Sequence, residues 1–330
     1  MSTFLDEMVS RAKSRKQTIV LAEGNDERTL KAAEQLLNQN VADLIILGNA
    51  DEIANSKYNL TGANLIDPQT SQLREELANE LFELRKHKGM TIEEAQTLIC
   101  DVLYFGVMLV KTNRANGMVA GACHSTGDVL RPSLQILKTA PGTKLVSSFF
   151  VMVVPDCNYG NNGTFVFADC GLEVQPDSER LAHIAVNSAK SFRTLIGAKP
   201  YVAMLSHSTY GSAKNDDATK VVEATRIAKE LAPDEAIDGE LQLDAALCPD
   251  VASAKCPASQ VAGKANVLVF PDLDAGNIGY KLVQRLAKAE AYGPITQGIA
   301  APVNDLSRGC SAEDIFGVAA ITCVQAQNIN

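Results

Sequence analysis

The sequence predicts an α/β protein of two domains, each built on a mostly parallel sheet flanked by helices. Short runs rich in Val, Ile and Leu alternate with helical patterns, which is typical of strands joined by crossover helices. At 330 residues the chain is about twice as long as a typical domain of ~150 residues. The composition shifts at Ala140-Pro-Gly142, after which strands dominate for a stretch. We therefore expect a domain boundary near residue 140.

The first part of the chain contains three apolar runs that are short enough to be strands and that end at turn residues. These runs are Thr18–Glu23, Asp43–Gly48 and Gly117–Gly121. Longer stretches that mix charged and apolar residues predict helices at residues 26–38, 71–88, 91–100 and from 128 to about 138.

The second part begins with two strand-like runs, residues 144–155 and 163–169, which are separated by a turn at residues 157–163 rich in Asn and Gly. Alternation then resumes, with helices expected at 177–196, 216–231 and 275–288 and strands at 201–205, 266–270 and 295–300. A C-terminal helix closes the chain.

Composition and missing motifs exclude several classes of protein. The net charge of −9 argues against nucleic acid and anionic membranes as partners. Apolar runs fall far short of the ~18 residues that span a bilayer, and the first 16 residues lack the apolar core of a secretory signal, so we expect a cytoplasmic protein. Eight cysteines without a Cys-x-x-Cys pair predict free thiols, and the four histidines lie outside any acidic cluster, so no metal site is expected.

Nucleotide-binding and hydrolase motifs are also missing from the sequence. There is no Gly-x-x-x-x-Gly-Lys-[Ser/Thr], no Gly-x-Gly-x-x-Gly after a strand and no Gly-x-Ser-x-Gly. The first strand–helix turn, residues 23–27, is acidic and would repel a pyrophosphate.

The segment from Pro302 to Gly317 concentrates candidate functional residues in a loop that turns into a helix. Arg308 supplies a planar fork for phosphate or carboxylate, and Gly309 lets a ligand approach the backbone. Ser311 has the position of an N-cap, which would direct free N–H groups at a bound anion. Asp314 fits two roles equally well: the second half of a capping box with Ser311, or a proton acceptor.

Two similar segments, Cys123-His-Ser-Thr-Gly-Asp128 and Ser206-His-Ser-Thr-Tyr-Gly211, each follow an apolar strand and precede a helix. Open α/β sheets bind ligands at such positions. The same residues are equally typical of helix caps that satisfy backbone groups.

Four longer segments together resemble the phosphate acetyltransferase (phosphotransacetylase) family, and the similarity runs over essentially the full chain. They are Glu83–Gly89, Gly121–Pro132, Asn266–Tyr280 and Gln297–Cys310. The resemblance implies reversible acetyl transfer between coenzyme A (CoA) and inorganic phosphate, with acetyl-CoA and acetyl phosphate as the other substrates and no cofactor. It also implies a homodimer whose active site lies in a cleft between two domains. The first domain would combine residues 1–140 with 300–330, and the second would span 141–299.

The resemblance assigns roles to individual residues. Ser307, Arg308 and Asp314 match the family's catalytic loop. The residues expected to contact CoA or the other substrates are Arg85, Arg131, Arg285, Ser125 and Thr126. The sequence departs from its relatives at residues 171–177, where Gly-Leu-Glu-Val-Gln-Pro-Asp stands in place of a segment richer in Asn and Pro.

The chemistry of acetyl transfer does not decide which group accepts the thiol proton of CoA. A CoA thiol has a pKa of about 8.5, so a base helps it react, but an ordinary Asp with a pKa near 3.9 is a weak base for it. Either Asp314 is desolvated, or Arg308 chiefly stabilises the negative charge. We expect Ser307 and the backbone N–H groups after Gly309 to stabilise the oxyanion. A rival mechanism would form an acetyl-enzyme on Cys310, whose thiol would need a lowered pKa.

Three alternative functions are weighed against direct acetyl transfer. A phosphate butyryltransferase would use the same residues on a longer acyl group. An NAD(P)-dependent acid dehydrogenase on a related fold would need metal-binding aspartates and an adenosine site, and neither is evident in the sequence. A non-catalytic module would not be expected to keep Ser307, Arg308 and Asp314 together.

Overall fold

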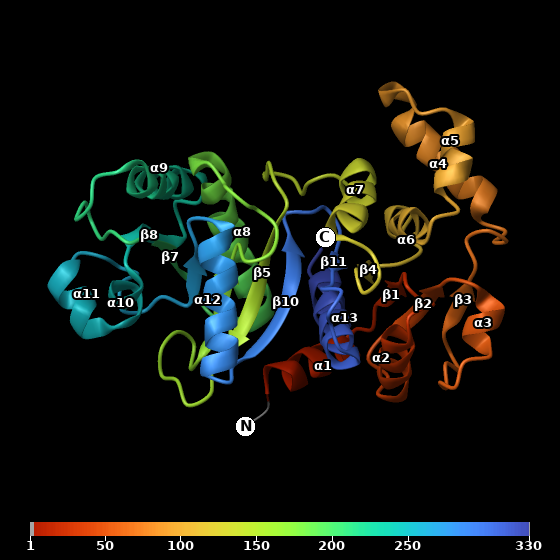
Figure 1. Ribbon diagram of the computed structural model, residues 1–330, viewed down its shortest axis with the longest axis horizontal. Helices are drawn as coiled ribbons and strands as arrows, with labels where there is room; N and C mark the ends of the chain where they lie inside the picture. The colour runs from red at the N-terminus through yellow and green to blue at the C-terminus, as the bar shows by residue number, and fades with distance from the viewer. Residues whose placement is uncertain (1–2, 330) are drawn as a thin grey trace. The chain divides into compact units, whose positions relative to one another are not determined.

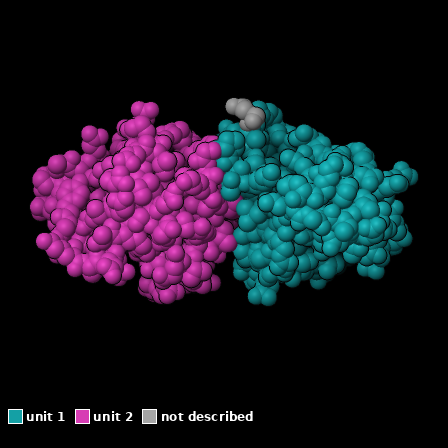
Figure 2. Space-filling model, turned by 90° about the horizontal axis from the view of Figure 1, so that it is seen from above, with its two compact units in different colours: residues 1–141, 299–330 teal, residues 142–298 magenta. Residues whose placement is uncertain are grey.

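The computed structural model describes residues 3–329, which divide into two compact units. Unit 1 comprises residues 1–141 and 299–330, and unit 2 comprises residues 142–298 (Figure 2). The C-terminal segment therefore returns to the unit in which the chain began.

Unit 1 is built on a five-stranded, wholly parallel sheet with the strand order β11-β4-β1-β2-β3. Its strands are β1 (Thr18–Leu21), β2 (Asp43–Leu47), β3 (Asn64–Ile66), β4 (Gly117–Ala120) and β11 (Val303–Asp305). The strands β1, β2, β4 and β11 are buried over almost their whole length, as expected of a parallel sheet covered on both faces.

Two groups of helices cover this sheet, on opposite sides of the strands in Figure 1. The first group is α1 (Phe4–Ser14), α2 (Glu27–Asn38) and α13 (Ala312–Gln327). The second is α4 (Arg74–Arg85), α6 (Val102–Lys111) and α7 (Thr126–Ile136). The short elements α3 (Ala50–Ala54), η1 (Lys86–Lys88) and α5 (Ile92–Leu98) complete the unit.

Unit 2 contains a six-stranded mixed sheet with the order β10-β5-β6-β9-β7-β8. Its strands are β5 (Ser147–Val153), β6 (Thr164–Ala168), β7 (Tyr201–Leu205), β8 (Ala236–Leu241), β9 (Val267–Val269) and β10 (Glu290–Gln297). Only β5 runs against the other five strands, because it precedes β6 in a hairpin and pairs antiparallel with β10 as well. The expected α/β class with mostly parallel sheets is confirmed.

Five helices belong to unit 2. They are α8 (Ser178–Ile196), α9 (Asp216–Leu231), α10 (Leu243–Leu247), α11 (Pro249–Lys255) and α12 (Leu273–Leu286). Helix α8 packs on β6, β9 and β7 and against α9, whereas α12 packs on β10, β5 and β6.

The structure adds several elements that the sequence patterns did not predict. Helices α1 and α6 and strands β3, β8 and β11 were not expected at all. The strand expected at 295–300 starts five residues earlier, at Glu290, and ends at Gln297. It contains Gly293-Pro294 and an irregular register against β5, which hide its start from an apolar pattern.

Candidate functional site

The candidate site lies at the carboxyl edge of the unit 1 sheet. Strands β11, β4 and β1 are neighbours and parallel, so the loops that follow them meet at one edge. These loops are residues 306–311, 121–125 and 22–26. Ligands of open parallel sheets bind at this edge.

The capping box expected between Ser311 and Asp314 is present at the start of α13. The Ser311 amide donates to Asp314 Oδ2 at 2.8 Å, the Ser311 hydroxyl donates to the same oxygen at 3.0 Å, and the Asp314 amide donates to Ser311 Oγ at 3.1 Å. Both capping bonds to the carboxylate use Oδ2, and the side chain is exposed. Asp314 thus secures the helix start and still presents Oδ1 for chemistry.

The turn after Ser307 uses three of its own backbone amides. The Gly309 amide donates to Ser307 Oγ at 3.3 Å, the Cys310 amide to the Ser307 carbonyl at 2.9 Å, and the Ser311 amide to Asp314. Of the N–H groups after Gly309, those of Cys310 and Ser311 are therefore already paired, and stabilisation of an oxyanion by the following ones at the start of α13 stays a prediction. The exposed donors in the turn are the Ser307 hydroxyl and the Arg308 guanidinium.

Arg28, at the start of α2, fastens this loop to the two neighbouring loops. Its Nη1 donates to the carbonyls of Arg308 and Cys310 at 2.8 and 2.9 Å. Its Nη2 donates to the Ala122 carbonyl at 2.9 Å and to Asp26 Oδ2 at 2.7 Å. Sequence reasoning missed this residue, because an arginine in the first turn of a surface helix carries no distinguishing pattern.

Glu23 occupies the position where an open sheet would bind an anionic ligand. Its side chain is buried and accepts the backbone amides of Ala122, Cys123 and His124 at 2.7, 2.9 and 3.1 Å. The His124 ring lies against the same carboxylate, with 2.7 Å between Nδ1 and Oε1. The Glu23 carboxylate therefore occupies the cluster of backbone N–H groups after β4 that could otherwise bind an anion.

Asp305, at the end of β11, is a second buried carboxyl group beneath these loops. Burial raises its pKa to about 6, with Glu23 adding to the increase and a hydrogen bond from Thr126 opposing it. Its Oδ1 is buried without a hydrogen-bond partner. The close approach of β11 also explains Gly121, which has φ +109° and would place a Cβ 2.4 Å from this oxygen.

The Cys310 thiol is unsuited to nucleophilic attack. Its side chain is buried, and burial raises its pKa to about 11 despite the opposing effect of Arg28. An acetyl-enzyme mechanism needs the pKa to move in the other direction. The structure thus favours the interpretation of Cys310 as a packed residue.

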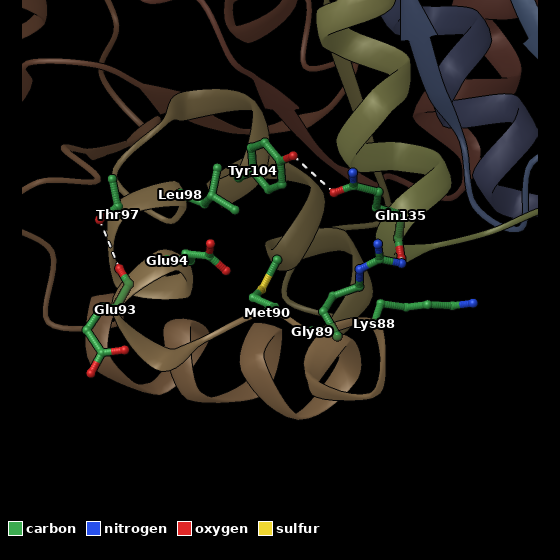
Figure 3. A pocket seen from close by; sticks show the side chains of 10 residues that line it. Lys88, Gly89, Met90, Glu93, Glu94, Thr97, Leu98, Tyr104 and Gln135 are labelled. Carbon is green, nitrogen blue, oxygen red and sulfur yellow. Dashed lines mark hydrogen bonds between the residues drawn. The ribbon is translucent and has the colours of Figure 1, made fainter.

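A pocket of about 660 Å³ in unit 1 brings Arg85 together with α5, α6 and α7. The Tyr104 hydroxyl donates to Gln135 Oε1 at 3.0 Å across one side of it (Figure 3). Arg85 Nη1 approaches the Gln135 carbonyl at 3.4 Å, while its Nε is buried without a partner. Burial raises the pKa of the Tyr104 hydroxyl, and the nearby positive charges of Arg131 and Arg85 oppose that increase.

Of the other expected substrate-binding residues, Ser125 caps α7 and exchanges hydrogen bonds with Asp128, so its capping role is real. Thr126 bonds Asp305 and is exposed, and Arg131 pairs weakly with Asp128 at 3.7 Å. Arg285 lies elsewhere, exposed on α12 of unit 2. Unit 1 alone thus gathers all the expected residues except Arg285.

Residues 3–329 contain neither a metal-binding cluster nor a helix that could span a membrane. No group of three or more His, Cys, Asp or Glu side chains within that range could hold a metal ion. No helix in the same range has the length and apolar character needed to cross a membrane.

Comparison with known proteins matches this arrangement to one class of enzyme. Residues 3–323 match the family model described as phosphate acetyl/butaryl transferase. A phosphate acetyltransferase of Acetivibrio thermocellus is 62% identical over 99% of each chain, and that of Thermoanaerobacterium thermosaccharolyticum is 58% identical over 98% of this chain and 100% of its own. The solved phosphotransacetylase of Streptococcus pyogenes superposes with a TM-score of 0.93 at 45% identity over 99% of each chain. The chain belongs to the phosphate acetyl/butaryl transferase family of acyltransferases.

Proposed function

We propose that the chain catalyses reversible acetyl transfer between CoA and inorganic phosphate: acetyl-CoA + phosphate ⇌ acetyl phosphate + CoA. The supporting observation is the exposed Ser307–Arg308 pair beside capped Asp314, in a chain that is 62% identical along its whole length to a phosphate acetyltransferase. Butyryl transfer is the alternative within the family, and the phosphate acetyltransferases of 55–62% identity favour acetyl.

In this proposal the transfer is direct, within a ternary complex. Arg308 binds the phosphate through its fork, and the Ser307 hydroxyl donates to the oxyanion of the tetrahedral intermediate. Asp314 takes the thiol proton of CoA through Oδ1, while Oδ2 stays bound to Ser311. The cap fixes the carboxylate before the substrates arrive, so capping and catalysis support each other.

We further propose that CoA binds through Arg85, Arg131, Arg285, Ser125 and Thr126. The buried, unpartnered Nε of Arg85 supports a role as a donor to a bound anion, because such a group costs about 1–3 kcal/mol until it is paired. Arg131 supports the same role, because its side chain is 62% exposed and lies 3.7 Å from Asp128, which leaves the guanidinium accessible to an anion.

The two compact units are, in this proposal, the two domains of the enzyme, which functions as a cytoplasmic homodimer. Support for dimerisation comes from α12, where Ile278, Leu282 and Leu286 recur every four residues and are 58%, 52% and 80% exposed. Such a stripe on a monomer surface is typical of an interface. The free thiols are typical of a reducing compartment.

The test is phosphate-dependent release of free thiol from acetyl-, propionyl- and butyryl-CoA. We expect acetyl-CoA to give the highest kcat/KM and omission of phosphate to abolish release. A preference for butyryl-CoA would favour the alternative, and no thiol release from any of the three would refute the proposal.

A further inference from the structure

His124 is the one imidazole in residues 3–329 that lies against a buried carboxylate. Its Nδ1 is 2.7 Å from Glu23 Oε1, and its side chain is 30% exposed, whereas that of Glu23 is 2% exposed. Glu23 accepts three backbone amides as well, so it is held rigidly from both sides. The Nδ1 side of the ring is thus held by a buried carboxylate, while the side chain as a whole remains partly exposed.

This contact determines which ring nitrogen is available. A carboxylate that accepts three N–H bonds is an acceptor, so Nδ1 must be the donor in the His124–Glu23 bond. In the neutral ring, Nε2 is then the acceptor. A carboxylate at Nδ1 fixes this tautomer and balances the charge that forms when Nε2 takes a proton, which is how enzymes orient a histidine for acid–base catalysis.

Arg28 joins the loop that carries His124 to the loop that carries Ser307 and Arg308. The same guanidinium binds the carbonyl of Ala122, two residues before His124, and the carbonyls of Arg308 and Cys310. The loop that carries His124 and the loop that carries Ser307 and Arg308 are therefore separated by the width of one planar group.

The ionisable groups that face this pair come from the elements around it. They are Asp26 and Arg28 at the start of α2, Asp128 in the first turn of α7, Asp305 at the end of β11, Cys123 beside the ring and Cys310 before α13. Asp26 is paired with Arg28, and Asp128 keeps its negative charge, because the hydrogen bond from the Ser125 hydroxyl lowers its pKa. His124 is thus the group here that is held by a buried carboxylate and is itself partly exposed.

We propose that His124, positioned by Glu23, is the acid–base residue for the reacting oxygen of phosphate. When acetyl phosphate reacts, the CoA sulfur forms a bond to the acetyl carbon and the carbon–oxygen bond to phosphate breaks. The thiol proton goes to Asp314, and Nε2 gives its proton to the departing phosphate oxygen. In the reverse reaction, Nε2 removes the proton from attacking hydrogen phosphate, and Asp314 returns a proton to the departing sulfur. Exchange with solvent resets the two groups.

Histidine suits the phosphate end of the reaction because an acid–base group works best when its pKa lies near the operating pH, and the ordinary histidine pKa is about 6.5. The inference rests on the proposed acetyl transfer, because it assigns the phosphate end of that reaction.

The second His-Ser-Thr segment provides a matched control. His207 in unit 2 is also exposed, but its Nε2 lies 3.1 Å from Asn215 Nδ2. The buried carboxylate nearby, Glu240, bonds Ser208 and Gly211 instead. His207 therefore shares the sequence motif of His124 and lacks its geometry.

The experiment compares His124→Asn with His207→Asn and wild type in both reaction directions. Asparagine can keep the donor to Glu23 through Nδ2 but has no equivalent of Nε2, so the loop is preserved. We expect His124→Asn to lower kcat about 100-fold or more, with the KM for CoA within twofold, since general acid–base groups contribute about 10²–10⁴. His207→Asn should keep kcat within twofold.

The pH dependence of the reaction rates distinguishes an acid–base role of His124 from a purely structural one. The ratio of wild-type to His124→Asn rates should fall as pH rises when acetyl phosphate is consumed, because Nε2 must then carry a proton. It should fall as pH drops when acetyl phosphate is made. Added imidazole should raise the rate of His124→Ala, which covers the case that His124→Asn does not fold. A kcat within threefold of wild type, the opposite pH trends, or no response to imidazole would overturn the proposal. Thiol release by wild type tests the acetyl transfer separately.

Discussion

Replacing Arg28 with Ala tests whether one guanidinium holds the candidate site together. The side chain donates to three backbone carbonyls from two loops and pairs with Asp26 at 2.7 Å. Its side chain is 32% exposed and that of Asp26 is 13% exposed, so the pair is only partly screened by water. We expect losses in both stability and turnover.

The size of the stability loss follows from these contacts. The Arg28 hydrogen bond is the largest of the causes that lower the pKa of Asp26 from 3.8 to about 2, against an opposing effect of burial. At ~1.4 kcal/mol per pKa unit this corresponds to about 2 kcal/mol. Each lost bond to a carbonyl that water can reach adds ~0.5 kcal/mol. The three carbonyl bonds together add about 1.5 kcal/mol, so the free energy of unfolding should fall by about 3.5 kcal/mol near neutral pH.

The pH dependence has a defined sign. Because the pKa of Asp26 is lowered in the folded state, its stabilisation is fully present above about pH 4 and disappears as pH falls towards 2. The difference between wild type and Arg28→Ala should shrink over that interval.

Urea unfolding followed by far-UV circular dichroism measures this effect, since the chain contains no tryptophan. Arg226→Ala is the matched control, because Arg226 likewise forms ion pairs, with Glu223 and Glu230, but is 54% exposed on α9. This substitution should cost less than ~1 kcal/mol. Arg28→Ala should in addition lower kcat about 10-fold or more through displacement of the loop. Equal stability of the two variants across pH 2–7 would refute the reasoning.

Three further substitutions separate the roles within the site. Asp314→Asn should lower kcat by about 10²-fold or more, as measured by thiol release, and should lower the unfolding free energy by only ~1 kcal/mol, as measured by urea titration. A loss of stability without a loss of turnover would mean that Asp314 only caps the helix. Cys310→Ala should keep kcat within about threefold. Loss of activity in a variant that remains folded would instead support the mechanism in which Cys310 forms an acetyl-enzyme. Arg85→Gln should raise the KM for CoA about 10-fold and leave that for phosphate unchanged, and Lys88→Gln at the pocket's rim is its control.

The sequence predicted most strands that are short apolar runs and the longer helices that are periodically amphipathic. It missed β8 because Asp238 and Glu240 interrupt the apolar pattern, although both are buried and bonded in the structure. It missed α6 because eight consecutive residues of that helix are buried, which removes the periodicity of a surface helix. Strand β11 is only three residues long. Local patterns cannot reveal such tertiary environments.

The candidate site was predictable where chemistry depends on a local motif. The cap formed by Ser311 and Asp314 follows from their spacing, and the structure contains it. Glu23 lies about 100 residues from the amides that it binds, and Arg28 about 280 residues from the carbonyls of the catalytic loop. Only the adjacency of β1, β4 and β11 brings them together, so no local sequence pattern indicates either role.

Direct transfer between CoA and phosphate is tested most directly by mixing the enzyme with acetyl-CoA in the absence of phosphate. The account predicts no release of thiol until phosphate is added, and then initial-rate lines that intersect as in a ternary-complex mechanism. A burst of one thiol per chain without phosphate, with parallel initial-rate lines, would mean that the acetyl group passes through the protein and would contradict the account.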